Sequence, residues 1–198
     1  HLQLNEDTLW SGKPHSYAVE GAAEHLPEVR RLLFEGKEAE AAKLAGQFFM
    51  GNPVFQQAYQ PLGDLTLIFQ GHDKVADYRR DLDLKTGVAH TRYRIGEATY
   101  TRSSFISAPD QVLVVRLEVD PPGQLDFEAE LASPHSHQVV QDGANRIKMT
   151  GHWLGEGKDK PLIAAVEGLG IRFESGLSAE LEGGTISIIE GHMRIRDA

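Results

Sequence analysis

Cysteine is absent from the 198-residue sequence. Its absence excludes a disulfide framework, thiolate zinc sites and a cysteine nucleophile. A basic excess is also lacking, because 20 Lys and Arg residues stand against 29 Asp and Glu residues, for a formal net charge of -9. Since nucleic-acid binding depends on clustered cationic side chains, the sequence predicts no nucleic-acid partner. No apolar run approaches the ~20 residues that a membrane-spanning helix needs, so no membrane partner is expected either.

Motifs that mark self-contained catalytic or cofactor sites are lacking as well. The sequence has no G-x-S-x-G nucleophile elbow, no Walker loop, no dinucleotide-binding glycine fingerprint and no H-E-x-x-H zinc motif. His135 and His137 have a spacing that would place them on one face of a strand, but Ser133 and Pro134 indicate a loop. We interpret both histidines as structural or surface residues, and we expect no metal and no cofactor.

What is present is the composition of an ordinary globular protein. Hydrophobic residues make up 40% and charged residues 25% of the chain, which argues against disorder. A chain of this length can bury a sizeable core and can form one large domain or two small ones. We predict a single domain over residues 1–198.

Helical periodicity is confined to residues 22–50. Apolar side chains recur there at helical spacing, with charged residues between them. Gly36 interrupts the pattern. The sequence therefore predicts two short helices, Leu26–Phe34 and Lys37–Phe48, as an insertion on a β domain.

From Leu65 onward the apolar residues recur with a period of two, which is typical of strands. Gly96 and Glu97 stand between two such runs and predict a tight hairpin turn. The continuously apolar Val112–Val115 predicts a central strand covered on both sides. Turn residues separate many short strands, and no helix follows each strand. We therefore predict a mainly β fold, an antiparallel β-sandwich with a small two-helix insertion near the N-terminus.

Two segments, Leu4–Gly12 and Tyr59–Leu65, place polar side chains around an aromatic ring next to a glycine. That composition suits a surface that binds a polar ligand such as a sugar. Trp10 offers a flat face for a pyranose ring, and we expect its indole N–H to be free to bond a hydroxyl. Clustered amides both donate and accept hydrogen bonds, as recognition of hydroxyl groups requires. The candidate substrate-binding residues are Asn5, Glu6, Trp10, Gln57, Tyr59 and Gln60.

Each of these residues also has a purely structural interpretation. Asn5, Glu6 and Asp7 suit a turn or a helix cap, and Trp10 and Tyr59 suit half-buried core aromatics. Glu6 and Asp7 cannot flank one scissile bond, because adjacent side chains of an extended backbone point to opposite faces. We further hypothesise that the two segments lie side by side and face a catalytic neighbour.

The same two segments resemble, nearly residue for residue, signature segments at the start of glycoside hydrolase family 95, the inverting α-L-fucosidase-type enzymes. Other segments that resemble the family follow in matching order: Leu26–Gly36, Asp77–Leu84, Ser107–Val112, Ser133–His135 and Glu182–Gly184. The resemblance covers nearly the whole chain. It implies the supersandwich-like N-terminal β-sandwich of that family, which precedes an (α/α)6 barrel and a C-terminal β domain.

The resemblance also implies a division of labour. The catalytic residues of the family lie in the barrel, so no catalytic residue is expected in this chain, which would be a fragment of a larger enzyme. The implied parent reaction is inverting hydrolysis of terminal α-L-fucosides in a fucosylated glycan, with α-L-galactosides as a close alternative. The implied partners are that glycan and the barrel of the same chain, and the family's usual habitat is secreted or periplasmic. A stand-alone carbohydrate-binding module and a purely structural sandwich domain stay open as alternatives.

Overall fold

In the computed structural model of the chain, residues 1–10, 16–52, 54, 58–153 and 171–198 are described. The chain forms two compact units. A β unit comprises His1–Glu6, Pro61–His152 and Arg172–Ala198, and a helical unit comprises Asp7–Gln60 and Trp153–Ile171. The prediction of one domain over residues 1–198 stays a prediction. Among the described residues, no helix has both the length and the apolar character needed to cross a bilayer.

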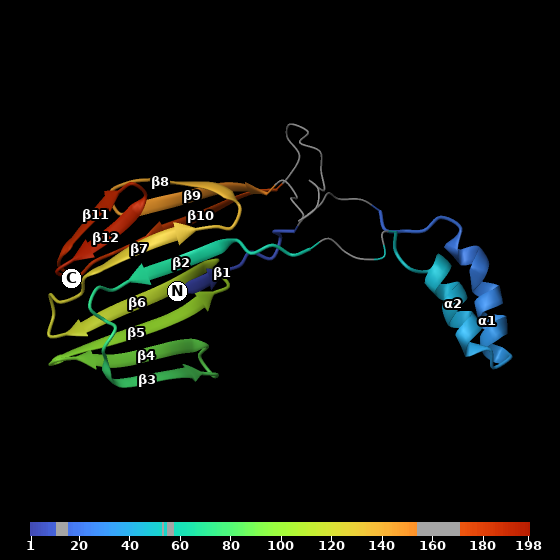
Figure 1. Ribbon diagram of the computed structural model, residues 1–198, viewed down its shortest axis with the longest axis horizontal. Helices are drawn as coiled ribbons and strands as arrows, with labels where there is room; N and C mark the ends of the chain where they lie inside the picture. Colours follow the sequence, from blue (N-terminus) through green and yellow to red (C-terminus); the bar gives the residue numbers. More distant parts are fainter. Residues whose placement is uncertain (11–15, 53, 55–57, 154–170) are drawn as a thin grey trace. The chain divides into compact units, whose positions relative to one another are not determined.

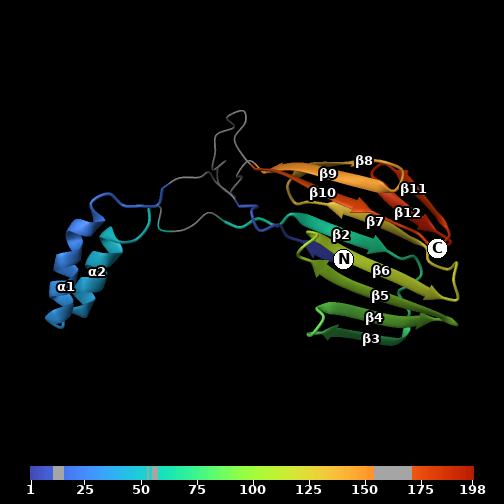
Figure 2. The same ribbon diagram turned by 180° about the vertical axis from the view of Figure 1, so that it is seen from behind.

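The helical unit is a hairpin of two antiparallel helices, seen from both sides in Figure 1 and Figure 2. A 3-10 turn, η1 (Ala22–His25), leads into α1 (Leu26–Phe34), and α2 (Glu38–Phe48) follows. Both predicted helices are confirmed, with α2 beginning one residue later than expected. Gly36 lies between them with φ +72°, a left-handed conformation that glycine adopts without strain. The hairpin has a small core of its own, made by Val29, Leu32 and Ala41.

The remaining elements are strands, as the period-two pattern predicts. Their bounds are β1 (Leu2–Leu4), β2 (Gly63–Ile68), β3 (Ala76–Asp83), β4 (Val88–Ile95), β5 (Ala98–Ser107), β6 (Val112–Asp120), β7 (Phe127–Ala132), β8 (Ser136–Gln141), β9 (Arg146–Trp153), β10 (Ile171–Ser178), β11 (Thr185–Ile189) and β12 (His192–Arg196). They form a five-stranded sheet in the order β1-β2-β7-β12-β11, a four-stranded sheet β3-β4-β5-β6 and a three-stranded sheet β10-β9-β8. Figure 2 shows β3 to β6 in this order. All of the strand pairs that are described are antiparallel, as predicted.

The core of the β unit lies on one face of the five-stranded sheet. Register places Leu65 beside Leu131 and Phe127 beside Ile195, so alternate residues of these strands share that face. The buried cluster on it also contains Tyr93 and Tyr100 of the four-stranded sheet. Ile147 and Met149 of the three-stranded sheet belong to the same cluster. Both smaller sheets therefore pack against the larger one, and the predicted antiparallel β-sandwich is confirmed.

The predicted Gly96–Glu97 hairpin is confirmed, because β4 ends at Ile95, β5 begins at Ala98 and these two residues pair. The prediction for Val112–Val115 was wrong. The segment lies in β6, at the edge of its sheet within the described part of the chain, and Val112 is 46% exposed. Alternate side chains of β6 point toward the core and toward the surface. The run is continuously apolar because the side chains on the surface face are apolar as well. Periodicity alone cannot distinguish this arrangement from a strand buried on both faces.

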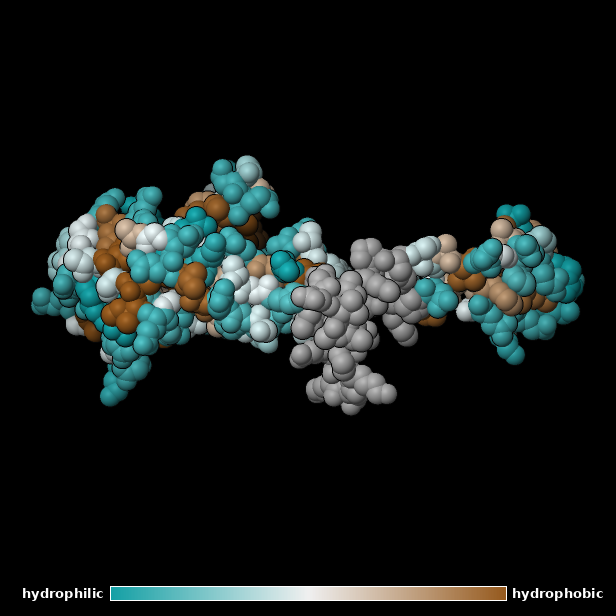
Figure 3. Space-filling model, turned by 90° about the horizontal axis from the view of Figure 1, so that it is seen from above, coloured by the Kyte–Doolittle hydropathy of each residue, from teal (hydrophilic) through white to brown (hydrophobic). Residues whose placement is uncertain are grey.

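Apolar patches interrupt the polar surface of each unit, as Figure 3 shows for the face in view. In the β unit the most exposed large apolar side chains are Leu84, at 88%, and Ile106, at 77%. In the helical unit Phe34 is 90% exposed. Single exposed apolar residues are normal on protein surfaces, so they do not mark a site by themselves.

Gly63 begins β2 where the backbone of a neighbouring strand leaves no room for a side chain. A Cβ at this position would lie 2.1 Å from the carbonyl oxygen of Ala132. We expect Gly63→Ala to lower the free energy of unfolding of the β unit by about 1–3 kcal/mol, measured by urea denaturation. Gly176→Ala is the matched control, because its Cβ would meet only the flexible end of Arg146, and we expect it to cost less than about 1 kcal/mol. Equal losses in both variants would contradict this explanation.

Candidate functional site

The two aromatic-centred segments meet through their backbones in the helical unit. Trp10 and Tyr59 form an isolated antiparallel β-bridge. The backbone N–H of Gln60 donates to the carbonyl oxygen of Leu9 over 2.8 Å. The side chain of Leu9 is only 1% exposed and anchors this crossing. The hypothesis that the two segments lie side by side is therefore confirmed for these residues.

The rings of Trp10 and Tyr59 contact each other edge to face. Their centroids are 5.3 Å apart and their planes meet at 65°, a geometry that aromatic quadrupoles favour. Trp10 is 39% exposed and Tyr59 is 41% exposed. The pair is thus fixed by its own contact while part of each ring remains at the surface, where it can pack against the C–H face of a sugar.

The prediction of a free indole N–H on Trp10 was wrong. This group donates to the carbonyl oxygen of Asp7 over 2.8 Å. The backbone N–H of Trp10 also bonds within its own turn, to the carbonyl oxygen of Thr8 over 3.0 Å. The tight turn at Asp7–Thr8 brings a carbonyl next to the ring, and a local acceptor competes well with a ligand hydroxyl. Trp10 can therefore offer a ligand its ring surface rather than a hydrogen bond.

The other candidate residues are distributed over both units. Gln60 is half-buried, and its side-chain amide donates to the carbonyl oxygen of Ala58 over 3.1 Å. Asn5 and Glu6 are exposed and follow β1 in the β unit, whereas Trp10, Tyr59 and Gln60 belong to the helical unit. Gln57 lies outside the described residues. The structure brings Trp10, Tyr59 and Gln60 together, and Asn5 and Glu6 follow Leu4, which pairs with Gly63 of the second segment.

His135 and His137 lie at the start of β8, where their rings form hydrogen bonds to backbone carbonyl groups. His135 is 8% exposed, and its Nε2 donates to the carbonyl oxygen of Pro61 over 3.0 Å. His137 Nδ1 donates to the carbonyl oxygen of His135 over 2.7 Å. Both contacts agree with the structural interpretation of these histidines. Within the ranges that the structure describes, no group of three or more His, Cys, Asp or Glu side chains is arranged to hold a metal ion.

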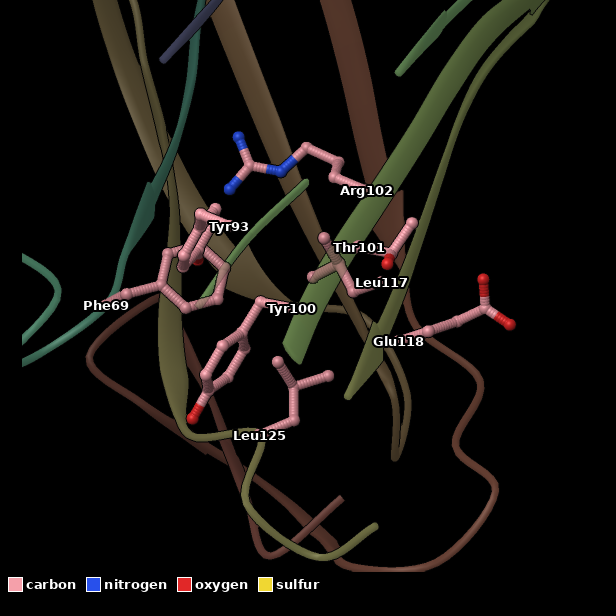
Figure 4. Close-up of a pocket in the computed structure, with 8 residues that line it drawn as sticks. All are labelled: Phe69, Tyr93, Tyr100, Thr101, Arg102, Leu117, Glu118 and Leu125. Carbon is pink, nitrogen blue, oxygen red and sulfur yellow. The ribbon is translucent and has the colours of Figure 1, made fainter. Parts of the chain in front are cut away.

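An aromatic cluster inside the β unit was not anticipated from the sequence. Figure 4 shows Phe69, Tyr93, Tyr100 and Arg102 around a small cavity. Tyr93 and Tyr100 stack with centroids 5.4 Å apart, and the guanidinium carbon of Arg102 lies 5.3 Å from the centre of the Phe69 ring. The cavity measures about 10 Å³, which is room for one water at most. We assign the cluster to packing. The pairing of Tyr93 with Tyr100 across the Gly96 hairpin was the signal in the sequence that could have revealed it.

His72 joins this cluster, and its titration gives the β unit a predictable pH dependence. Its Nδ1 lies 2.9 Å from the hydroxyl of Tyr93. Burial, followed by the positive charge of Arg102, lowers the pKa of His72 below its usual 6.5. The unfolded chain therefore binds more protons than the folded chain around pH 6.5. This contribution to stability is complete above that pH and is lost as the pH falls from there toward the lowered pKa of the folded state.

We therefore expect the wild-type β unit to lose more stability than His72→Phe between about pH 7.5 and about pH 5.5. Urea denaturation at both pH values measures this difference, and the variant keeps an aromatic ring in the cluster. Equal pH dependence in the two proteins would show that His72 does not titrate differently on unfolding.

Comparison with known proteins identifies similarity over the whole sequence. Residues 1–198 match the family model described as "Glycosyl hydrolase family 65, N-terminal domain". A curated relative from Arabidopsis thaliana, "Alpha-L-fucosidase 2", is 42% identical over 154 residues, which are 76% of this chain and 18% of the relative. "Probable alpha-fucosidase A" of Aspergillus oryzae is 34% identical over 125 residues, which are 59% of this chain and 16% of the relative.

A third relative, "Probable alpha-fucosidase A" of Aspergillus niger, is 31% identical over 160 residues, or 76% of this chain and 19% of the relative. The chain thus spans less than a fifth of the length of each of these relatives.

Proposed function

Because the chain belongs to the family of glycosyl hydrolase family 65 N-terminal domains, we propose that its parent enzyme hydrolyses terminal α-L-fucosides with inversion. In this proposal the chain supports a catalytic (α/α)6 barrel of the same polypeptide and shapes the entrance to its active site. The names of the matched relatives support a fucoside as the substrate. The resemblance to glycoside hydrolase family 95 supports the presence of the barrel and the inverting stereochemistry.

One structural observation carries the proposed role at the entrance. Trp10 and Tyr59 hold each other edge to face at 5.3 Å while about two fifths of each residue stays exposed. A rigid, partly exposed aromatic pair binds a pyranose at a low entropic cost, because the rings are already positioned. Gln60 beside them adds an amide, whose carbonyl oxygen accepts hydrogen bonds from hydroxyl groups. We propose that the side chains that contact the sugar belong to the following set: Asn5, Glu6, Trp10, Gln57, Tyr59 and Gln60.

The proposed division of labour predicts that residues 1–198 alone do not cleave an aryl α-L-fucoside, whereas the complete enzyme does. The physical reason is that an inverting glycosidase needs two carboxyl groups about 6.5–9.5 Å apart on opposite sides of the bond, and the proposal assigns both to the barrel. Circular dichroism checks that the isolated chain is folded. Proton NMR of the first sugar anomer that the complete enzyme releases tests whether the reaction inverts. Robust turnover by the isolated, folded chain would refute the proposal, and an aryl α-L-galactoside as the preferred substrate would correct the sugar.

The exposed Trp10–Tyr59 pair also supports a second candidate, a carbohydrate-binding module that acts without a catalytic neighbour. Isothermal titration of the isolated chain with a fucosylated oligosaccharide separates the two functions. Binding by residues 1–198 alone, abolished by Trp10→Ala, would favour the module. No binding by the folded chain, together with sugar-dependent kinetics in the complete enzyme, would favour the role at the entrance.

A further inference from the structure

A groove of about 760 Å³ opens into the β unit, and it is too large to be filled by a few buried waters. Its floor is the apolar inner face of the five-stranded sheet. The floor residues are Leu65, Leu67, Phe127, Ala129, Met193 and Ile195. Five of these six residues belong to the buried core, and only Leu67 is half-buried. Leu117, Leu177 and Leu181, which also line the groove, are half-buried apolar residues packed against that core, so a segment that fills the groove must bring apolar side chains.

One side of the groove is the edge of β6. Every residue from Leu113 to Val119 borders it, although consecutive side chains of a strand point to opposite faces. A continuous run of residues can line a groove only where the edge of the strand borders it. β6 pairs with β5 and with no other strand in the described ranges. Alternate N–H and C=O groups of β6 therefore point into the groove.

The opposite side is formed by Leu177–Glu182, again a continuous run. β10 ends at Ser178, but its alternation of half-buried and exposed residues continues through Glu182. Ala179 is held from the side away from β6 by Asn145. The Ala179 N–H donates to the Asn145 carbonyl oxygen over 3.0 Å, and Asn145 Nδ2 donates to the Ala179 carbonyl oxygen over 2.9 Å. This segment is thus extended and presents a second backbone edge to the groove.

We propose that the groove receives one extended strand, which pairs with β6 on one side and with Leu177–Glu182 on the other. The inserted strand would join the four-stranded and three-stranded sheets into a single layer over the five-stranded sheet. A groove with two backbone edges favours an extended polypeptide, because main-chain hydrogen bonds to both edges supply affinity. Specificity comes from the floor, which accepts apolar side chains at alternate positions of the bound strand. The charged residues along the two sides are Arg116, Glu118, Glu180 and Glu182, so the outward face of the strand is expected to be polar or basic.

We assign the strand to the same enzyme, outside residues 1–198. The occupant needs two free edges, but every strand in the described part of this chain already has a partner on at least one edge. The described strands of a second copy therefore cannot fill the groove. The matched relatives are each more than five times longer than the part that this chain covers, so such enzymes contain other segments to supply the strand.

A photo-crosslinker placed beside the groove in the complete enzyme tests the assignment. Arg116→p-benzoyl-L-phenylalanine suits this purpose, because the Arg116 side chain is 69% exposed and its ion pair with Glu118 is a surface contact of small energetic value. After irradiation, peptide mapping should identify a cross-link within one polypeptide to a single segment outside residues 1–198. The same substitution at Arg92, an exposed position on β4, is the control and should not capture that segment.

Hydrogen exchange on the same enzyme gives an independent result. All amides of Leu113–Val119 should be protected, including the alternate ones that β5 does not engage, whereas alternate amides on the outer edge of β3 should exchange fast. Cross-links confined to residues 1–198, a cross-link to a second molecule, or fast exchange of alternate β6 amides would each overturn the proposal. Neither measurement depends on whether the enzyme cleaves a fucoside, so this inference and the proposed function can fail separately.

Discussion

Replacing Ile195 by alanine is expected to lower the free energy of unfolding of the β unit by about 2–5 kcal/mol, among the largest effects of any single core substitution here. Ile195 is 0% exposed and lies on β12, paired with Phe127 of β7. Its side chain belongs to the cluster that all three sheets share, so its truncation leaves a cavity between the layers of the sandwich. Urea denaturation followed by the far-ultraviolet circular dichroism of the strands measures the loss.

Ile189→Ala is the matched control for this prediction. It removes the same atoms from β11, the strand beside β12, but Ile189 is 47% exposed. We expect it to cost less than about 1 kcal/mol, because little apolar surface is buried there and no closed cavity forms. Similar losses in the two variants would show that the shared cluster is not the main core of the unit.

Most of the architecture could be predicted because local patterns and tertiary burial agree in this chain. The helical spacing before Phe48 is matched by a hairpin whose core is Val29, Leu32 and Ala41. The period-two pattern after Leu65 is matched by strands whose alternate residues face one core. The resemblance to the N-terminal domain of fucosidase-type glycoside hydrolases is confirmed by the family match and by the relatives. The fold can be predicted from such a sequence because its local secondary-structure patterns agree with the tertiary packing.

The sequence did not reveal features that depend on which strand lies beside which. Val112–Val115 has the composition of a central strand, but sheet order places it at an edge that borders a large groove. The partner of the Trp10 indole is a backbone carbonyl of Asp7, and residue types carry no information on backbone acceptors. The meeting of Trp10 with Tyr59 was only a hypothesis, because 48 residues separate them in the chain and no local periodicity links them.

Trp10→Ala in the complete enzyme is expected to lower kcat/KM on a fucosylated substrate while the protein stays folded. Trp10 is 39% exposed and its ring is fixed against Tyr59, so we expect removal of the ring to cost a sugar contact of about 1–3 kcal/mol. That corresponds to a loss of roughly 5- to 150-fold. The loss should appear as a raised KM if the contact is equal in the ground and transition states, and as a lowered kcat if it tightens only in the transition state.

Two further variants separate a sugar contact from a structural role. Trp10→Phe keeps a flat ring and should recover part of the activity, although it removes the indole N–H that bonds Asp7. Tyr78→Ala removes an aromatic side chain that is 58% exposed on β3 in the β unit, outside the candidate site, and should leave the kinetics unchanged. If Trp10 only supports the fold, Trp10→Ala will lower the melting temperature while the folded enzyme keeps its wild-type kcat and KM. In that case Trp10 supports the backbone crossing at Leu9 and Gln60, and the sugar contact must be sought elsewhere.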